Sequence, residues 1–408
     1  MRVFTGCYDI ASVLSGVTEG FRLAGHSVTS FVLERNKFYP DAGYDVIKEL
    51  PIHSRFRYNE VKIPGFIKAG FQKADSLIYR KQLKRLTHKL IDEHDLFVFI
   101  WRPWLDEQYL FPLIKQKGKK IVCLQLGSDV RHIAAYKQEY NEDVSLWEQY
   151  FHDEDLNEKI KKIRSQELYA DAIFSVPDQA GLAIRGYNHL HIPIRNLNKI
   201  RFNIPGRKIP VIIHAPSRSG IKGTSIILAA LERLKNEGVE FELRLLQNLP
   251  NHELINQLSD ADILIDEILL HGPGVLSFEA MAAGTLVVTR TIGNHKDIFD
   301  PPVVDIRPYN VYEKIKHILL NRNNYTDYLE KGRKYVELNN TPKNIAENIS
   351  RCISLKETDY FPDFFSKKFE LSESQTLSAA AKQLNRDVFE LYGKSNYDFA
   401  SLTNRGLI

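Results

Sequence analysis

Short apolar runs with the length of a buried strand alternate with helix-period segments along this chain. Two such runs lie at residues 96–101 and 172–176, and residues 10–23 have apolar side chains at helical spacing. Strands that alternate with helices form parallel α/β layers, because a parallel connection needs a crossover. With 43% hydrophobic residues in 408, the chain can fill complete cores, which excludes disordered and fibrous classes. The sequence therefore predicts an α/β protein.

A polar, basic stretch at residues 197–210 separates two regions in which strands alternate with helices. Strands are predicted at residues 3–5, 27–33, 96–101, 120–124, 172–176, 211–214, 241–246, 263–266 and 286–289. Helices are predicted at residues 10–23, 224–236, 251–258, 275–283 and 372–392. We expect an N-terminal domain (1–200), a C-terminal domain (208–355) and a helical tail (356–408) that packs back on the domains. Two α/β halves leave a cleft, and ligands of such sheets bind beyond the carboxyl ends of the strands.

Charge, cysteine content and hydropathy narrow the class of partner. The net charge of +4 is too small a bias to indicate a nucleic-acid partner. Cys7, Cys123 and Cys352 are far apart in the sequence, so neither a disulfide framework nor a zinc ribbon is expected. The first residues lack the apolar core of a signal peptide, and no run of about 18 apolar residues is present. We expect a soluble, cytoplasmic protein.

A Gly-Pro-Gly turn precedes the predicted helix that begins at Val275. The backbone amides at such a helix start, after Gly272 and Gly274, favour a bound phosphate. One turn further in, Glu279 is a lone charge among apolar neighbours and would accept hydrogen bonds from a ligand hydroxyl, such as a ribose diol. The alternative is a capped core helix in which Glu279 pairs with a nearby Arg or Lys.

A second loop follows the predicted strand at residues 211–214. It begins with Ser217 and places Arg218 and Lys222 four residues apart among small residues. Two cations over a glycine-bearing loop would form a diphosphate clamp, and a solvated basic loop is the alternative. Both loops follow strands of one α/β domain on their carboxyl side, so they are predicted to border one pocket.

These motifs resemble the nucleotide-binding domain of GT-B fold glycosyltransferases, in particular the family 4-type group of retaining enzymes. The shared elements are Ser217-Arg218…Lys222-Gly223, Ala261-Asp262, and Gly272…Gly274…Glu279-Ala280-Met281-Ala282…Gly284 followed by Leu286-Val287-Val288. In the N-terminal half, Gly25-His26-Ser27-Val28 is also similar to that group. The resemblance implies two Rossmann-like domains that face a cleft, a nucleotide-sugar donor as substrate, and no metal or other cofactor.

The resemblance also implies roles for the donor-side residues. Arg218 and Lys222 would hold the donor's diphosphate and stabilise the departing nucleotide. Glu279 would bind the ribose hydroxyls, and the amides after Gly274, starting at Val275, would touch the distal phosphate.

One position departs from the group's pattern. Many members carry a glutamate eight residues before the ribose-binding one, where this chain has His271. His271 would contact the donor sugar or phosphate instead, or Glu267 and Asp266 would reach in. Loss of catalysis is a further alternative.

The acceptor side is expected in the N-terminal half. Gly6 and Asp9 follow the first predicted strand, and Asp129 and Arg131 follow the strand at residues 120–124. Asp9 or Asp129 would position the acceptor hydroxyl, which makes Asp129 a candidate catalytic residue, and Arg131 would meet a phosphate. Turn capping explains either aspartate equally well.

Residues 51–90 carry ten basic and two acidic side chains with apolar ones interleaved. Such a surface suits an anionic membrane or a lipid-diphosphate acceptor, and a solvated helix face is the alternative. The sequence thus predicts a glycosyltransferase that uses a nucleotide sugar and a saccharide or lipid-linked acceptor. We expect it in the cytoplasm, or at the inner face of the membrane, in surface polysaccharide or glycolipid assembly. A catalytically silent GT-B partner subunit and a sugar-nucleotide epimerase are the alternatives.

Overall fold

The computed structural model describes most of the chain. The described residues are 1–36, 38–40, 42–47, 81–141, 145, 155–293, 296–394 and 396–408. The basic segment expected to face a membrane lies outside them over residues 51–80. Within the described part, no helix combines the length and the apolar character needed to span a bilayer.

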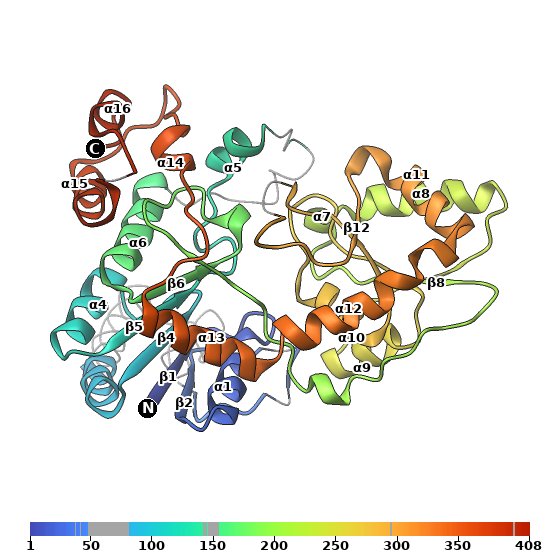
Figure 1. The fold of residues 1–408 in the computed structure, drawn as a ribbon, viewed down its shortest axis with the longest axis horizontal. Helices are drawn as coiled ribbons and strands as arrows, with labels where there is room; N and C mark the ends of the chain where they lie inside the picture. Colours follow the sequence, from blue (N-terminus) through green and yellow to red (C-terminus); the bar gives the residue numbers. More distant parts are fainter. Residues whose placement is uncertain are drawn as a thin grey trace, which may run out of the picture.

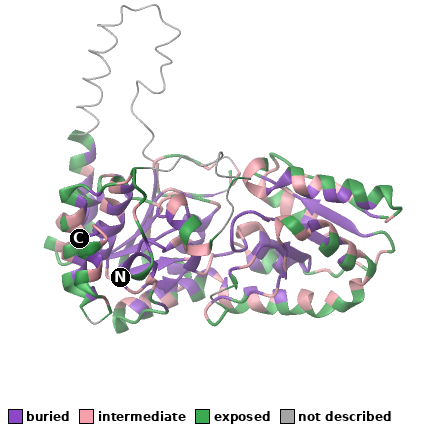
Figure 2. Ribbon diagram, turned by 90° about the horizontal axis from the view of Figure 1, so that it is seen from above, coloured by how far each residue is buried: buried purple, intermediate pink, exposed green. Residues whose placement is uncertain are grey.

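In the described residues, the first half is built on a parallel sheet of seven strands in the order β3-β2-β1-β4-β5-β6-β7. The strands are β1 (Arg2–Cys7), β2 (Ser27–Val32), β3 (Val46–Ile47), β4 (Leu96–Ile100), β5 (Lys120–Leu124), β6 (Ala172–Ser175) and β7 (Asn188–His189). Helices α1 (Val13–Leu23) and α13 (Pro342–Leu355) cover one face. Helix α4 (Glu107–Gln116) and helical residues 81–93 cover the other. Because both faces are covered, the central strand β4 is buried at every residue (Figure 2).

The first strand is longer than the sequence predicts. We expected the apolar run at residues 3–5 to stop at Gly6, but β1 continues through Gly6 to Cys7, and Gly6 pairs with Phe31 and Phe99 on its two neighbours. A Cβ on Gly6 would lie 2.8 Å from the ring of Phe4. Gly6 is therefore a strand residue that leaves room for an aromatic ring, and the loop at this edge of the sheet starts after Cys7.

The described part of the second half contains five parallel strands in the order β12-β11-β10-β8-β9. They are β8 (Val211–His214), β9 (Glu242–Leu245), β10 (Ile263–Ile265), β11 (Leu286–Thr289) and β12 (Val304–Asp305). Helices α8 (Thr224–Asn236) and α11 (Val311–Leu320) pack on one face. Helices α9 (Asn251–Leu258), α10 (Val275–Ala283) and α12 (Thr326–Asn339) pack on the other. The prediction of two α/β halves is confirmed.

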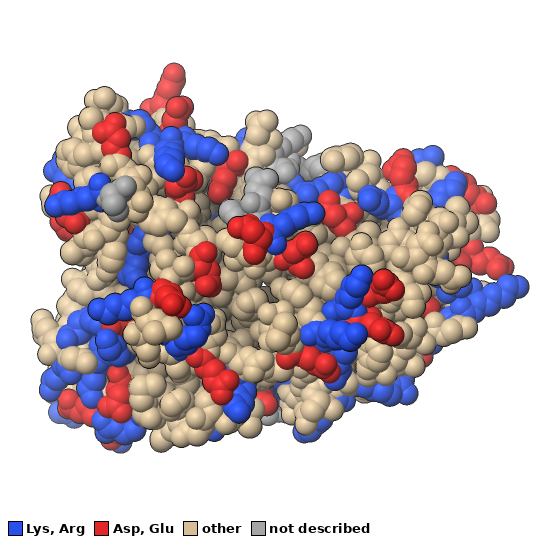
Figure 3. Space-filling model, viewed as in Figure 1, with Lys and Arg blue, Asp and Glu red and all other residues tan. Residues whose placement is uncertain are grey.

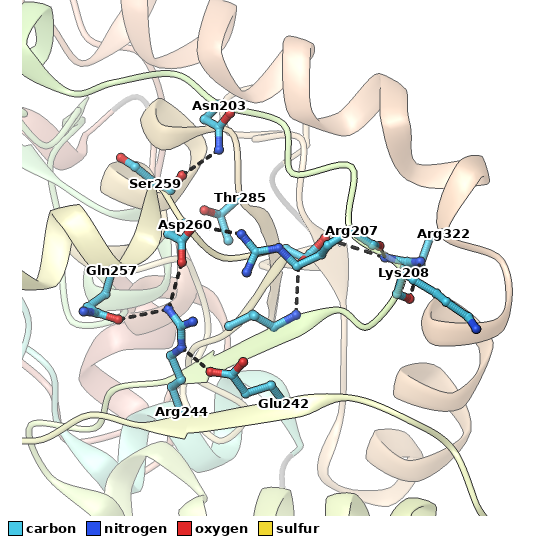
Figure 4. A network of polar contacts seen from close by, with 12 residues as sticks. Asn203, Arg207, Lys208, Glu242, Arg244, Gln257, Ser259, Asp260, Thr285 and Arg322 are labelled. Carbon is cyan, nitrogen blue, oxygen red and sulfur yellow. Dashed lines mark hydrogen bonds and ion pairs between the residues drawn. The ribbon is translucent and has the colours of Figure 1, made fainter.

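The predicted linker at residues 197–210 is held against the second half by contacts of its side chains and its backbone (Figure 4). The guanidinium of Arg207 lies 2.7 Å from a carboxylate oxygen of Asp260. Arg322 donates to the backbone carbonyls of Arg207 and Lys208, each at 3.0 Å. Arg207 and the backbone carbonyls of this segment therefore attach it to the domain that follows.

The chain returns to the first half after α12. Helices α12 and α13 run one after the other across both halves (Figure 1), and α13 packs on α1. A Cβ on Gly20 of α1 would lie 2.0 Å from the carbonyl oxygen of Pro342, so only glycine permits this approach. The expected domain limits at 200, 208 and 355 remain predictions, and the apolar side chains of α13 lie in the core of the first half.

The C-terminal tail is helical over less of its length than expected. Residues 372–378 are not helical, and α15 (Ala379–Val388) begins only where the Ser378 hydroxyl caps it by accepting from the amide of Ala381. A π-helical turn at Phe389–Gly393 and α16 (Phe399–Asn404) follow. The tail, which also includes α14 (Phe364–Lys367), packs on α6 (Leu156–Tyr169) of the first half, where buried Arg164 donates to Asn385 (Figure 1).

Candidate active site

The candidate site lies where loops from the carboxyl ends of both sheets meet. The hydroxyl of Tyr136, on α5 (Ile133–Tyr140), lies 2.7 Å from Nδ1 of His271 in the second half. The backbone amide of Asn251, the first residue of α9, donates to the backbone carbonyl of Phe38 in the loop after β2. The described loops therefore touch one another between the halves. This is the edge at which parallel sheets bind their ligands.

Lys222 lies at the carboxyl end of the strands in the second sheet. It ends the short helix α7 (Ser219–Lys222), and its Nζ lies 2.5 Å from Oδ1 of Asp266 and 3.7 Å from Oε2 of Glu267. Burial alone would lower the pKa of Lys222, but the charges of the two carboxylates outweigh burial and raise it. Lys222 is therefore protonated, and Asp266 and Glu267 fix the position of its ammonium group.

The N-terminus of α10 lies next to the ammonium group of Lys222. Gly274 is the residue before the helix, and Val275 is its first residue. A Cβ on Gly274 would lie 3.9 Å from Nζ of Lys222 and 3.6 Å from Oδ2 of Asp266. Gly272 has a φ of 84°, which favours glycine at this turn. The structure thus brings together the lysine and the glycine turn, which the sequence predicted to border one pocket.

Glu279 lies one turn further along α10 and is 4% exposed. Its Oε1 accepts a hydrogen bond of 2.8 Å from the side-chain amide of Asn251. Burial raises the pKa of Glu279 to about 7, and the charge of Asp266 adds to this shift. The partner is therefore an amide on α9, whereas the alternative interpretation required an Arg or Lys. Sequence reasoning missed Asn251, although the residue opens a predicted helix.

Ser217 and Arg218 lie at the exposed start of α7. The side chain of Arg218 makes no hydrogen bond or ion pair with the residues that the structure describes. The structure therefore places Lys222, but not Arg218, against the carboxylates and the start of α10. The diphosphate roles of Ser217 and Arg218 remain predictions.

His271 is buried between the halves. Its ring packs against Tyr140 with the centroids 4.5 Å apart, in addition to the contact with Tyr136. Burial and the nearby charge of Arg290 lower the pKa of His271 to about 2, so the imidazole is neutral. The geometry joins His271 to α5, and its expected contact with the donor sugar remains a prediction.

Glu267, the alternative acid on the donor side, is the second residue after β10. Its Oε1 is buried and has no hydrogen-bond partner in the described part of the chain. Burial raises the pKa of Glu267 to about 7, with Lys222 opposing the shift. A buried carboxyl oxygen without a partner is costly in the absence of a ligand, and it offers an acceptor to one.

Both candidate aspartates of the first half accept backbone hydrogen bonds. Asp129 accepts from the amides of Gly127 at 2.8 Å and Leu126 at 3.2 Å. Asp9 accepts from the amide of Leu14 at 3.0 Å and from the hydroxyl of Tyr44 at 2.7 Å. The turn-capping contacts that the sequence allowed are therefore present, and the acceptor roles remain predictions.

Arg131 pairs with a residue that sequence reasoning missed. Its guanidinium lies 3.2 Å from Oδ2 of Asp178, and both side chains are buried. Burial raises the pKa of Asp178 to about 6, against the charge of Arg131. The available signal was the position of Asp178, two residues after the predicted strand at 172–176. Arg131 also interacts electrostatically with Glu267, which links the two halves.

A separate cavity lies elsewhere between the halves. A cavity of 470 Å³ is lined from the first half by His189, His191 and α13, and from the second half by Asp297 and Ile298. Figure 3 shows this face hollowed between the halves, with positive and negative side chains intermixed. The predicted site residues do not line this cavity. Among the described residues, no cluster of three His, Cys, Asp or Glu side chains has the arrangement of a metal site.

Comparison with known proteins gives similarity only at the level of structure. No protein-family model matches the chain, and no curated protein matches its sequence. HepE of Anabaena, solved in complex with UDP-glucose, is 11% identical with a TM-score of 0.54, over 87% of this chain and 99% of that one. Sucrose-phosphate synthase from Thermosynechococcus elongatus is 14% identical with a TM-score of 0.55, over 87% and 98%.

A third similar structure is an α-glucosyltransferase in complex with UDP-glucose and DNA. It is 12% identical with a TM-score of 0.53, over 87% of this chain and 99% of that one. At these identities the likeness defines the fold. The chain has the GT-B fold, with two Rossmann-like domains.

Proposed function

We propose that the protein is a glycosyltransferase that moves a sugar from a UDP-sugar to a hydroxyl of a saccharide or lipid-linked acceptor. One observation carries this proposal: Lys222, the start of α10 at Gly274 and the buried carboxyl of Glu279 share one edge of the second sheet. A cation, free helix amides and a buried acceptor are what a diphosphate attached to a ribose requires.

The proposed chemistry is positioning and charge stabilisation. Lys222 and the amides after Gly274 hold the donor diphosphate and offset the charge that develops on it as the bond to the sugar breaks. Glu279 accepts hydrogen bonds from the ribose hydroxyls. Residues of the first half, with Asp9, Asp129 and Arg131 as candidates, orient the acceptor hydroxyl toward the anomeric carbon. Contact between the halves excludes water, which would otherwise consume the donor.

The fold neighbours support the choice of donor. HepE and the α-glucosyltransferase were each solved with UDP-glucose. We infer a UDP-sugar donor, transfer with retention and no metal requirement, in surface polysaccharide or glycolipid assembly. The α-glucosyltransferase was solved with DNA, but the net charge of +4 is too small to indicate a nucleic-acid acceptor here.

The test is a thermal-shift screen against UDP, GDP, ADP, CMP and TDP, repeated on Glu279→Ala and Lys222→Ala. A ligand that binds only the folded state raises its melting midpoint. We expect a shift with UDP that both variants lose and that the control Lys331→Ala, at an exposed lysine of α12, retains. The unliganded midpoint of each variant reports whether it folds. No shift with any nucleotide would contradict the proposal.

A second step separates catalysis from binding alone. Radiolabelled UDP-glucose is incubated with lipid-linked and saccharide acceptors, and the anomeric configuration of any product is read by NMR. UDP binding without transfer or donor hydrolysis would favour the silent partner subunit. Conversion of the donor without an acceptor would favour the epimerase.

A further inference from the structure

Two carboxylates share one ammonium group at the start of α10. Asp266 and Glu267 approach Nζ of Lys222 at 2.5 Å and 3.7 Å. Asp266 also accepts a 2.7 Å hydrogen bond from the hydroxyl of Ser277, so both of its oxygens have partners. Glu267 has only the longer lysine contact, and its Oε1 is buried without a hydrogen-bond partner among the described residues. Of the two carboxylates, Glu267 is held less firmly.

The donor diphosphate would enter this cluster under the proposed function. Each phosphate of a nucleotide sugar carries one negative charge, and the site already holds two carboxylates for one lysine. The charged groups that act on Glu267 are its chain neighbour Asp266 and, from other elements, Lys222, Arg131 and Asp178. Arg131 and Asp178 pair with each other, so together they add little net charge. A buried site of this kind cannot keep every anion ionised.

We propose that Glu267 takes up one proton from solvent when the nucleotide-sugar diphosphate binds, and that its protonated carboxyl donates a hydrogen bond to a phosphate oxygen. This inference rests on the proposed function. In the free protein Glu267 is a partner of Lys222. In the complex the phosphate replaces Glu267 as the ion-pair partner of Lys222, and the neutral carboxyl of Glu267 donates a hydrogen bond to that phosphate.

The two neighbouring carboxyls differ in a way that selects Glu267. Burial raises the pKa of Glu267 to about 7 even with Lys222 beside it. Burial alone would also raise the pKa of Asp266, but Lys222 and Ser277 outweigh it, and that pKa is lowered. Adding a phosphate next to Lys222 raises the pKa of Glu267 further, because the lysine charge is then shared.

The test is calorimetric titration of the full-length protein with UDP-glucose in HEPES, PIPES and Tris. These buffers differ in ionisation enthalpy, so the dependence of the observed heat on the buffer gives the number of protons taken up. Both phosphates of UDP-glucose are esterified and do not titrate near neutral pH. A group with a pKa of about 7 predicts uptake of roughly 0.25 proton at pH 6.5 and roughly 0.9 at pH 8. The affinity should weaken roughly eightfold over the same range.

Glu267→Gln is the diagnostic variant, because its amide donates a hydrogen bond without titrating. We expect it to lose the proton uptake assigned to Glu267 and the pH dependence of affinity that goes with it. Any proton exchange at Glu279, whose pKa is also raised to about 7, is common to both proteins and cancels in the difference between them. Glu139→Gln is the matched control: Glu139 is also a buried carboxyl, with its pKa raised to about 8, but the groups acting on it do not include Lys222. We expect this control to keep the uptake of the unmodified protein.

The outcomes separate the two proposals. Binding of UDP-glucose without proton uptake would overturn this inference and leave the proposed donor intact. So would uptake that Glu267→Gln does not reduce, or that disappears only in Glu139→Gln. Absence of any UDP-glucose binding would overturn the proposed donor, and this inference with it.

Discussion

The hydroxyl of Tyr136 and the imidazole of His271 form a hydrogen bond of 2.7 Å that joins the two halves. Tyr136 is 2% exposed and His271 is 8% exposed, so water does not replace either partner. The position that the sequence analysis assigned to donor-sugar contact therefore has a structural partner on the opposite half. Removal of the hydroxyl tests how much this contact contributes.

We expect Tyr136→Phe to destabilise the protein by about 1–2 kcal/mol, because it leaves a buried ring nitrogen without this partner. Chemical denaturation monitored by tryptophan fluorescence measures the change. Tyr309→Phe is the control, since Tyr309 is 85% exposed, and we expect it to leave stability unchanged. An unchanged midpoint for Tyr136→Phe would show that the contact contributes nothing to holding the halves together.

Glu279 and Asn251 should affect nucleotide binding unequally. Glu279→Ala removes the proposed ribose acceptor, and we expect UDP affinity to fall at least tenfold, which corresponds to about 1.4 kcal/mol. Asn251→Ala removes only the side-chain amide that donates to the Glu279 carboxyl at 2.8 Å, and we expect a smaller loss of UDP affinity. Calorimetric titration with UDP gives both values. An Asn251 effect larger than that of Glu279 would indicate that the amide, rather than the carboxylate, contacts the nucleotide.

Loss of the Lys222 ammonium group should destabilise the free protein in a pH-dependent way. Lys222→Ala leaves Asp266 and Glu267 buried without their cation, which costs about 3–5 kcal/mol in comparable cases. The cost should be smaller at pH 5.5 than at pH 8, because the carboxyls can then be protonated. Urea denaturation at both pH values measures it. A loss that does not vary with pH would argue against an electrostatic origin.

Glu139, on α5, should make the protein less stable at high pH. Burial and the charge of Asp178 raise its pKa to about 8. The folded state therefore holds this proton more tightly than the unfolded chain, whose glutamates have a pKa of about 4.3. The resulting stability is complete below pH 4 and is lost as the pH rises through 8. We expect Glu139→Gln to gain on the order of 4 kcal/mol between pH 5 and pH 8.5 relative to the unmodified protein.

Urea unfolding curves at the two pH values test this expectation. Glu313→Gln, at an exposed position of α11, is the control and should show no pH-dependent gain. Equal stability changes for Glu139→Gln at both pH values would mean that Glu139 is already ionised in the folded state at pH 5, and that its pKa is not raised.

The sequence predicted regular elements best where periodicity and end signals agree. The helix at residues 275–283 and the strand at 286–289 have the observed bounds, since Gly274 and Gly284 mark the ends of that helix. Strands β3, β7 and β12 were not predicted. Each spans two residues, which is too short for any hydrophobic pattern, and each forms only because a neighbouring strand offers its edge.

The candidate site was predictable where its residues belong to loops that follow predicted strands of one sheet, which included the approach of Lys222 to the glycine turn. Glu279 and the glycine turn belong to one local motif, and the structure places Gly274 of that turn near Lys222. The contacts of Asn251 with Glu279 and of Asp178 with Arg131 join residues 28 and 47 positions apart. Such pairs are set by how the strands are ordered in the sheets, and a single sequence does not give that order.

The packing of α13 on α1 has a consequence for dissecting the molecule. A fragment that ends at residue 200 would lack α13 and would expose the apolar stripe around Val17 and Phe21, which α13 helps to cover. We therefore expect fragment 1–200 to aggregate when expressed alone. A circularly permuted chain that begins near residue 342 would keep α13 and the tail continuous with the strands they cover. The autonomous folding unit of the first half is thus discontinuous in the gene, and any domain exchange with another enzyme would have to transfer both of its segments.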